Sequence, residues 1–265
     1  MVGRPRSSGQ LTFCIPLLPR KNARDWDRVV EVLTQTLRSL AGQTNQSFSL
    51  IMAGQNDPGI LQQFDFPSKF LAVDYDFGDR PEDKLKDKRW KRNLMHREVR
   101  ALGGGYVMAL DADDLISNRL VDHVLTTAHP YGYIIETGYA FDWANQRLAP
   151  IPGAFSSNFD KVCGSCSIIY YGEDDLPRRG EERGDKFYYR LKGHAAWAPV
   201  MTEAGRPLEV VPFPAAVYVL NHDNNLHNSI SPSRETVVPR SIEKQQVPIT
   251  PELIREFSLP VDLRP

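Results

Sequence analysis

The chain has 265 residues, of which 41% are hydrophobic and 25% are charged, and its formal net charge is −1. This apolar fraction excludes wholesale disorder, and the balanced charge argues against a protein that holds nucleic acid by bulk electrostatics. No apolar run approaches the roughly 18 residues that a transmembrane segment needs, and three cysteines do not make a disulfide framework. We therefore expect a cytoplasmic globular protein, with a flexible, basic N-terminus at 1–10 that is not typical of a signal peptide.

The first half of the chain alternates apolar runs of strand length with amphipathic helical patterns. Apolar runs predict strands at 11–18, 48–53, 70–77 and 106–110. Asp25 can cap a helix whose apolar residues recur at helical spacing from Trp26 to Leu40, and a second helix is expected from Lys84 to Leu102. This alternation predicts an α/β fold with a mostly parallel sheet.

The second half consists of shorter elements separated by long loops that contain glycine and proline. Strands are expected at 133–139, 167–171, 187–191 and 215–220, and helices at 118–127, at 195–203 and from Thr250-Pro251 onward. Long loops in a compact fold often carry the substrate site. We predict one mixed α/β domain over 11–230, followed by a C-terminal arm at 231–265 that could pack on a partner.

Three carboxylates follow the apolar run at 106–110, in the sequence Asp111-Ala112-Asp113-Asp114. Because successive side chains of a strand point to opposite faces, Asp111 and Asp113 should lie on the same side, at the edge where open α/β sheets bind ligands. Two hard oxygen donors there suit Mg²⁺ or Mn²⁺. The alternative is a polar loop in which one aspartate caps the next helix.

These residues resemble the GT-A glycosyltransferases, in particular the large inverting family 2. YVMALDADD at 106–114 is similar to that family's strand and metal-binding Asp-X-Asp motif, and Lys88…Arg92-Asn93…Gly105-Tyr106 is similar to the run that precedes it. LTFCIPLLPRKN at 11–22 resembles the first strand, and GQNDPG at 54–59 stands where the family has a nucleoside-contacting aspartate. The resemblance covers roughly residues 11–228.

The resemblance implies a Rossmann-like mixed sheet with helices on both faces, a nucleotide-binding half at 11–117 and an acceptor half at 118–230. It implies transfer of a sugar, with inversion, from a nucleoside-diphosphate donor to a hydroxyl of a glycan or other acceptor. Candidate donor contacts are Pro16, Arg20, Asp57, Lys88, Arg92, Asn93 and Asp111. Lys88 and Arg92 are chosen from a basic run because they are four residues apart, on one helix face. Asp111, Asp113 and His222 would hold Mn²⁺ or Mg²⁺, with His227 as an alternative to His222.

The family's catalytic base belongs to a Glu-Asp pair, which lies about a dozen residues before a glycine. Gly205 matches that glycine, but this chain has no Glu-Asp pair at the corresponding distance. At that distance this chain has Gly193-His194, and a histidine of ordinary pKa can act as a base. The other candidate is Asp174, in a Glu-Asp-Asp run that could equally be a solvated turn. Trp143 and Trp197 could line an acceptor pocket.

Other interpretations of the sequence stay open at this point. Trp26 and Trp90 are expected in the core, and Cys163 and Cys166 are expected to be structural, because no second ligand pair has zinc-site spacing. Three rival functions are a nucleotidyltransferase of the same fold, an aspartyl phosphohydrolase, and a degenerate fold that binds nucleotide or glycan without turnover. The first normally has a glycine-rich loop after the first strand, and the second has its motif near the chain start.

Overall fold

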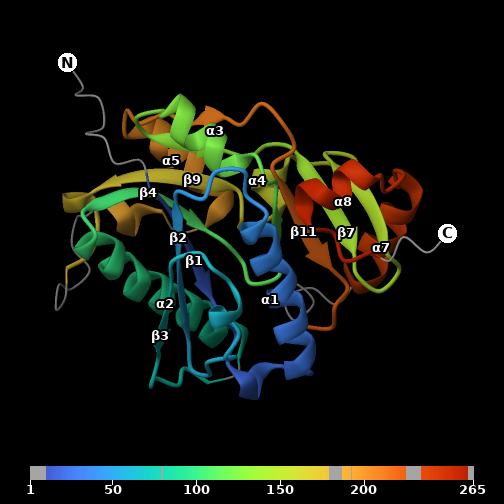
Figure 1. Ribbon diagram of the computed structural model, residues 1–265, viewed down its shortest axis with the longest axis horizontal. Coiled ribbons are helices and arrows are strands. Elements are labelled where there is room, and N and C mark those ends of the chain that lie inside the picture. The colour runs from blue at the N-terminus through green and yellow to red at the C-terminus, as the bar shows by residue number, and fades with distance from the viewer. Residues whose placement is uncertain (1–9, 79, 179–186, 192, 225–233, 262–265) are drawn as a thin grey trace.

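The computed structural model describes residues 10–78, 80–178, 187–191, 193–224 and 234–261. Among these residues the strands form a seven-stranded sheet in the order β10-β6-β9-β4-β1-β2-β3 and a four-stranded sheet in the order β5-β11-β7-β8 (Figure 1). The larger sheet contains β1 (Leu11–Pro16), β2 (Phe48–Gly54), β3 (Ser68–Ala72), β4 (Gly104–Ala109), β6 (Gly132–Ile134), β9 (Ser167–Gly172) and β10 (Glu209–Val210). The smaller contains β5 (Leu115–Ile116), β7 (Gly138–Asp142), β8 (Arg147–Ile151) and β11 (Ala216–Leu220).

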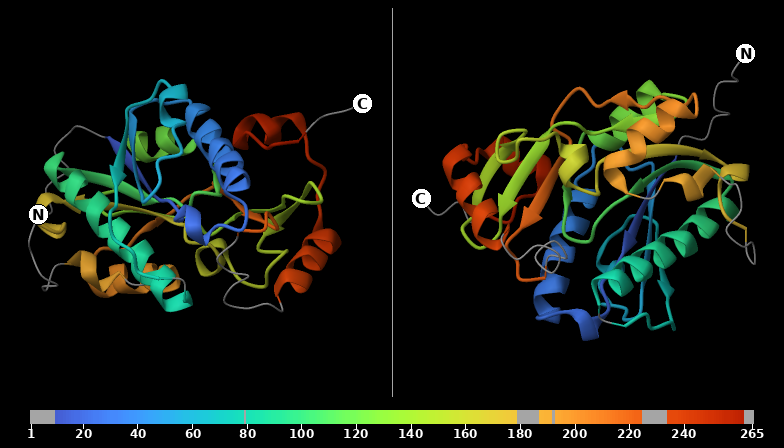
Figure 2. Two further views of the ribbon diagram at one scale, coloured as in Figure 1. Left: turned by 90° about the horizontal axis from the view of Figure 1, so that it is seen from below. Right: turned by 180° about the vertical axis from the view of Figure 1, so that it is seen from behind.

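Helices cover both faces of the larger sheet. The α-helices are α1 (Trp26–Ala41), α2 (Pro81–Ala101), α3 (Leu120–Thr127), α4 (Phe159–Val162), α5 (Trp197–Glu203), α7 (Arg234–Gln245) and α8 (Pro251–Phe257). Figure 2 shows α1 and α3 on one side of the sheet and α2 and α5 on the other. The predicted fold class, a Rossmann-like mixed sheet with helices on both faces, is confirmed by this arrangement.

The centre of the larger sheet sets the position of the site. β1 is parallel to both β2 and β4, so the carboxyl ends of these three strands meet at one edge. The side chains of β1 from Leu11 to Ile15 are buried, as continuous apolar strands covered on both faces should be. β9 runs antiparallel to β4, so its carboxyl end lies at the opposite edge.

Several predicted elements agree with the structure. Asp25 caps α1, where its Oδ1 accepts a hydrogen bond from the Arg28 backbone N–H at 3.0 Å. Thr250 likewise caps α8, accepting from the Leu253 N–H. The strands expected at 48–53, 106–110, 167–171 and 215–220 and the helix expected over 84–102 are present with small shifts of their ends.

Other predicted elements differ from the structure. The run at 133–139 is split between β6 and β7, which lie in different sheets. Where β7 begins, the backbone of Gly138 passes too close to the Ala216 carbonyl for a side chain. The run at 187–191 is the 3₁₀ helix η4 (Phe187–Arg190) instead of a strand, and the Tyr188 ring packs on that of His96 at 4.5 Å. β3 ends at Ala72, five residues before the predicted end. Trp90, expected in the core, is 46% exposed.

The C-terminal segment is part of the fold where it is described. Phe257 and Leu259 are buried in a second apolar cluster together with Val32 of α1 and residues of the smaller sheet. The Gln35 side chain donates a hydrogen bond to the Ser258 carbonyl at 2.8 Å. Among the described residues no helix combines the length and the apolar character needed to cross a membrane.

We expect Gly132→Ala to lower the free energy of unfolding by at least about 2 kcal/mol, because an added Cβ would collide with the Ile168 backbone carbonyl of β9. Gly103→Ala is the matched control, since Gly103 has a similar φ of +92° against +106° but nothing within 4 Å of an added Cβ. Urea unfolding of both variants measures the difference. Equal losses would contradict the close approach of β6 and β9.

Candidate functional site

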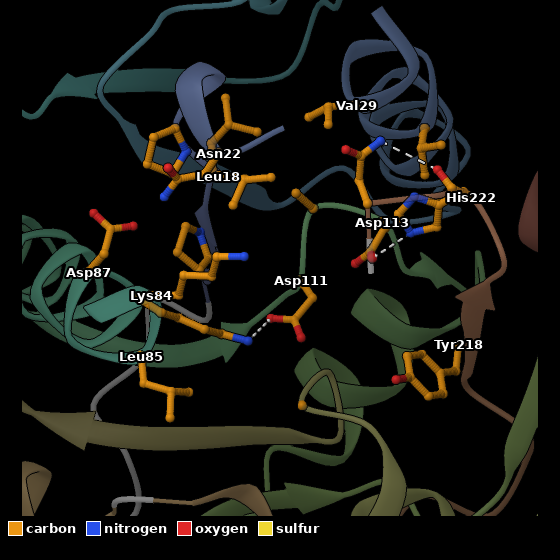
Figure 3. Close-up of a pocket in the computed structure, with 18 of the residues that line it drawn as sticks. Leu18, Asn22, Val29, Lys84, Leu85, Asp87, Asp111, Asp113, Tyr218 and His222 are labelled. Carbon is orange, nitrogen blue, oxygen red and sulfur yellow. Dashed lines mark hydrogen bonds and ion pairs between the residues drawn. The ribbon is translucent and has the colours of Figure 1, made fainter. Parts of the chain in front are cut away.

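The three carboxylates of Asp111-Ala112-Asp113-Asp114 lie at the carboxyl edge of β4, and each has a different partner. The Oδ1 of Asp111 is 2.6 Å from the Lys88 Nζ, and the Oδ2 of Asp113 is 2.9 Å from the His222 Nε2. Asp114 is fully buried. Figure 3 shows Asp111 and Asp113 turned to their separate partners at the pocket wall. The motif therefore presents two carboxylates to the pocket and one to the core.

The pair formed by Asp111 and Lys88 places a fixed cation beside the motif. Burial opposes the charged ammonium, but the Asp111 carboxylate outweighs it with help from Asp113, so the pKa of Lys88 is raised above its ordinary value. Gly164 passes on the other side of Asp111, where an added Cβ would lie 3.0 Å from the Asp111 Oδ2. The carboxylate is thus confined between a lysine and a glycine.

The pair formed by Asp113 and His222 joins the two sheets. His222 follows β11, and its side chain is 4% exposed. Asn224, two residues later, donates from Nδ2 to the backbone carbonyl of Asp25 at 3.2 Å, while its Oδ1 accepts from the Arg24 N–H at 2.9 Å. This segment therefore closes one wall of the pocket by binding the start of α1.

Asp114 organises the floor of the site. Its Oδ2 accepts hydrogen bonds from Ser165 Oγ at 2.6 Å and Cys163 Sγ at 3.0 Å, and its Oδ1 accepts from the Val219 N–H at 3.2 Å. Burial, and then the charges of Asp113 and Asp111, raise the pKa of Asp114 well above its usual value. The run at 163–166 is therefore a structural loop, with both cysteines free and buried as predicted.

These groups surround a pocket of about 310 Å³. Of the residues predicted for the site, Pro16, Lys88, Asp111, Asp113, His194 and His222 line it. They come from β1, α2, the loop after β4, η5 (His194–Ala196) and the loop after β11. The structure therefore brings the predicted metal ligands, one predicted base and part of the predicted donor contacts to one cavity.

Some predicted residues lie outside this pocket. Asp57 is exposed, and its Oδ1 accepts a hydrogen bond from the Gly59 N–H at 2.8 Å within a turn. The exposed Arg20 donates its backbone N–H to the Asn56 Oδ1 at 2.9 Å. The Arg92 guanidinium lies over the ring of Trp197, 4.9 Å from its centroid, and Asn93 lies beside it on α2, also outside the pocket lining.

Asp174, the other candidate base, lies outside this pocket. It lies in the 3₁₀ helix η3 (Glu173–Asp175) after β9, at the sheet edge opposite Asp111. Its side chain is 88% exposed and pairs with Arg178 at 3.4 Å. Trp143 and Trp197 are both buried and do not line the pocket. His227 lies outside the described residues.

His194 remains as the candidate base. It begins η5 at the pocket wall and is partly buried. Burial lowers the pKa of His194, and the charge of Lys88 acts in the same direction, while a hydrogen bond to the Lys161 backbone and the Asp111 carboxylate oppose the change. The imidazole is therefore neutral at pH 7, the form that can accept a proton.

Several pocket residues have no counterpart among the predicted site residues: Asn22, Lys84, Leu85, Asp87, Tyr218 and Asn224. Lys84 and Asp87 belong to the charged run of α2, in which the sequence does not reveal which charges face a cavity. Lys84 is four residues before Lys88, and this helical spacing could have indicated that the two lysines lie on one face of α2. Asp87 directly precedes Lys88, a spacing that gives no such indication.

The pocket contains carboxylate and imidazole groups, which are possible ligands for Mn²⁺ or Mg²⁺. In the part of the chain that the structure describes, no three His, Cys, Asp or Glu side chains gather closely enough to hold a metal ion. The Asp113 Oδ2 and the His222 Nε2 are nevertheless 2.9 Å apart. This separation matches that of two neighbouring ligands of one ion, which are about 3 Å apart when each is about 2.1 Å from the ion and the two lie at right angles. Because such ions commonly take phosphate and water oxygens as their other ligands, this pair fits a cation that a bound phosphate completes.

Comparisons with known proteins give distant similarities. No protein-family model matches the chain, and no curated protein matches it. It is similar to a crystal structure of S. aureus TarS, with 13% identity and a TM-score of 0.43 over 81% of this chain and 37% of that one. It is also similar to S. aureus TarS 1–349 in complex with UDP, with 13% identity and a TM-score of 0.45 over 80% of this chain and 60% of that one.

A third similar structure, from Desulfovibrio desulfuricans G20, is described as a nucleotide-diphospho-sugar transferase. It shares 12% identity and a TM-score of 0.37 over 86% of this chain and 88% of that one. The chain spans less than two thirds of either TarS structure. These similarities are too distant to assign an activity, which has to be inferred from the residues of the site.

We expect Ser165→Ala to lower the free energy of unfolding by about 1–3 kcal/mol, because the buried Asp114 carboxylate loses a donor at 2.6 Å. Ser167→Ala is the matched control: Ser167 is equally buried, but its Oγ has no hydrogen-bond partner among the described residues. We expect that control to change stability by less than about 0.5 kcal/mol. Chemical denaturation checks both values, and equal effects would contradict the role given to Asp114.

Proposed function

We propose that the chain is a metal-dependent GT-A glycosyltransferase that moves a sugar, with inversion, from a nucleoside-diphosphate donor to an acceptor hydroxyl. One observation carries this proposal: Asp111 and Asp113, at the carboxyl edge of β4, share a pocket with Lys84, Lys88 and His194. A diphosphate needs cations, and an acceptor hydroxyl needs a base. The pocket offers both within one cavity.

The residues of α2 supply the charge that a diphosphate requires. Lys84 and Lys88 are one helical turn apart and both line the pocket. Because the pKa of Lys88 is raised, its ammonium stays charged at neutral pH and can pair with phosphate oxygens as it now pairs with Asp111. A divalent cation held by Asp113 and His222 would neutralise the negative charge that develops on the leaving diphosphate.

In this reaction His194 is the base that takes the proton of the acceptor hydroxyl. The acceptor oxygen forms a bond to the anomeric carbon, the bond from that carbon to the diphosphate oxygen breaks, and its electron pair leaves with the nucleoside diphosphate. The hydroxyl proton passes to His194, whose lowered pKa keeps its imidazole neutral beforehand. Asp174 takes no part, because its exposed carboxylate lies at the opposite sheet edge.

Calorimetric titration with UDP, GDP, CDP and dTDP, each with and without Mn²⁺, tests the donor class. We expect one nucleotide to bind more tightly with Mn²⁺, and Asp113→Asn to remove that gain, weakening binding about tenfold or more. Asp174→Asn is the control and should bind as the parent protein does, because its side chain is 88% exposed and remote. Failure of every nucleotide to bind a folded protein would overturn the proposal.

The pH dependence of donor hydrolysis tests His194, with water as the acceptor and release of nucleoside diphosphate as the readout. The base must be neutral, and the pKa of His194 is lowered. The rate should therefore stay constant as the pH falls from 7, and should decrease only below about 6.5, the ordinary pKa of histidine. His194→Gln should cost about 100-fold or more and abolish that acid limb. An unchanged rate and profile in the variant would remove His194 from the mechanism.

A further inference from the structure

The imidazole of His222 lies in a sharp turn of the chain after β11. Its neighbours Asn221 and Asp223 have φ values of +60° and +69°, in the left-handed region of backbone conformation. Asparagine and aspartate enter this region more readily than other residues with a side chain, but it is uncommon even for them. The imidazole reaches Asp113 from this turn (Figure 3), so its direction depends on how the turn is held.

Asp142 is a buried carboxylate beside this turn that the proposed mechanism does not use. It ends β7, where it pairs in parallel register with Leu220, the last residue of β11. Asp142 is fully buried, and its Oδ1 accepts a hydrogen bond from the Asn221 Nδ2 at 2.8 Å. Because a buried carboxylate is costly without such donors, this bond holds Asn221 in place.

The other hydrogen bonds of Asp142 serve a different part of the chain. Its Oδ1 also accepts from the Asn145 backbone N–H at 3.1 Å, and its Oδ2 accepts from the Asn145 Nδ2 at 2.8 Å. These two bonds close the turn between β7 and β8. The bond from Asn221 contributes nothing to that turn, because it joins Asp142 to a segment 79 residues further along the chain. It acts instead on the loop that carries His222.

The turn at His222 is anchored on its other side as well. Asn224 binds the start of α1 through both polar atoms of its carboxamide, donating to the Asp25 carbonyl and accepting from the Arg24 N–H. The segment between the two anchors contains His222, whose side chain is 4% exposed and whose Nε2 is 2.9 Å from the Asp113 Oδ2. Two ligands that are already held at this distance lose little conformational freedom when they bind one ion.

We propose that Asp142 is a positioning residue that, through Asn221, holds the His222 imidazole beside Asp113 in the arrangement that binds a divalent cation. This inference rests on the proposed function, from which it takes the cation. Asp142 does not line the pocket, so it acts on the cation only through His222. The gain in diphosphate affinity that Mn²⁺ provides should therefore depend on the bond between Asp142 and Asn221, whereas diphosphate binding without Mn²⁺ should not.

Asn221→Gly removes this bond without straining the backbone, because glycine readily adopts a positive φ. Gln146→Gly is the matched control. Gln146 has a φ of +52°, and its side chain also makes a hydrogen bond, from Nε2 to the Trp143 carbonyl at 2.8 Å, in the turn between β7 and β8. Calorimetry would use whichever of UDP, GDP, CDP and dTDP binds the parent protein best, with and without Mn²⁺. We expect Asn221→Gly to reduce the gain from Mn²⁺ about tenfold or more, and Gln146→Gly to retain it.

Electron paramagnetic resonance of bound Mn²⁺ gives a second readout, which a loss of stability alone would not change. The imidazole nitrogen of His222 should couple to manganese in the parent protein and in Gln146→Gly, and this coupling should be weakened or lost in Asn221→Gly. Asn221→Asp is a second variant of unchanged size and should have the same effect, because a carboxylate cannot donate to Asp142. Thermal unfolding checks that each variant is folded.

Retention of both the gain from Mn²⁺ and the nitrogen coupling in the folded Asn221 variants would overturn the positioning role of Asp142 and leave the proposed function intact. An equal loss in Gln146→Gly would also overturn it, because the effect would then not depend on Asn221. A parent protein whose diphosphate binding gains nothing from Mn²⁺ would instead overturn the proposed function on which this inference rests.

Discussion

Three carboxylates within four residues, directly after a buried strand, repel one another unless each has a cationic or hydrogen-bonding partner. The positions of these partners determine the rest of the site. Lys88 pairs with Asp111, His222 pairs with Asp113, and Asp114 turns into the core to accept three hydrogen bonds. The compensating groups come from α2, from β11 and the loop after it, and from the loop at 163–166. The charge of one short segment therefore holds distant parts of the chain together.

This compensation also joins the two sheets. β4 belongs to the larger sheet, while β5, which follows the acidic segment, and β11 belong to the smaller one. The Asp114 carboxylate binds the Val219 N–H of β11, and His222 extends from the end of that strand to Asp113. The pocket thus lies at a junction whose geometry is fixed by buried hydrogen bonds, and this suits a site that has to hold a polar ligand in one orientation. Lys88 and Lys84 face that junction from α2.

The sequence predicts the parts of this site that depend on local periodicity. The apolar run before Asp111 predicts β4 and so places Asp111 and Asp113 at its carboxyl edge, although they lie in a turn after the strand and do not alternate along it. Helical spacing from Trp26 to Leu40, with Asp25 before it, predicts α1. The rest depends on contacts between distant segments. Asp57, in the turn after β2, is exposed, whereas Asp87 of α2 lines the pocket and pairs with Lys91 and Gln55, and no local pattern distinguishes the two. Asp174 follows a strand as Asp111 does, but β9 is antiparallel to β4, a direction that no local pattern reveals.

The most direct test of this account is to locate the ligand by crystallography with Mn²⁺ and the nucleoside diphosphate that binds best, using the anomalous signal of manganese. The account predicts manganese between Asp113, His222 and the phosphate oxygens, with the Lys88 ammonium moved toward the diphosphate. Nucleotide bound elsewhere, for instance in the hollow lined by Arg97, Arg100 and Arg178 at the other end of α2, would contradict it. In that case the partners of the three carboxylates would serve stability alone.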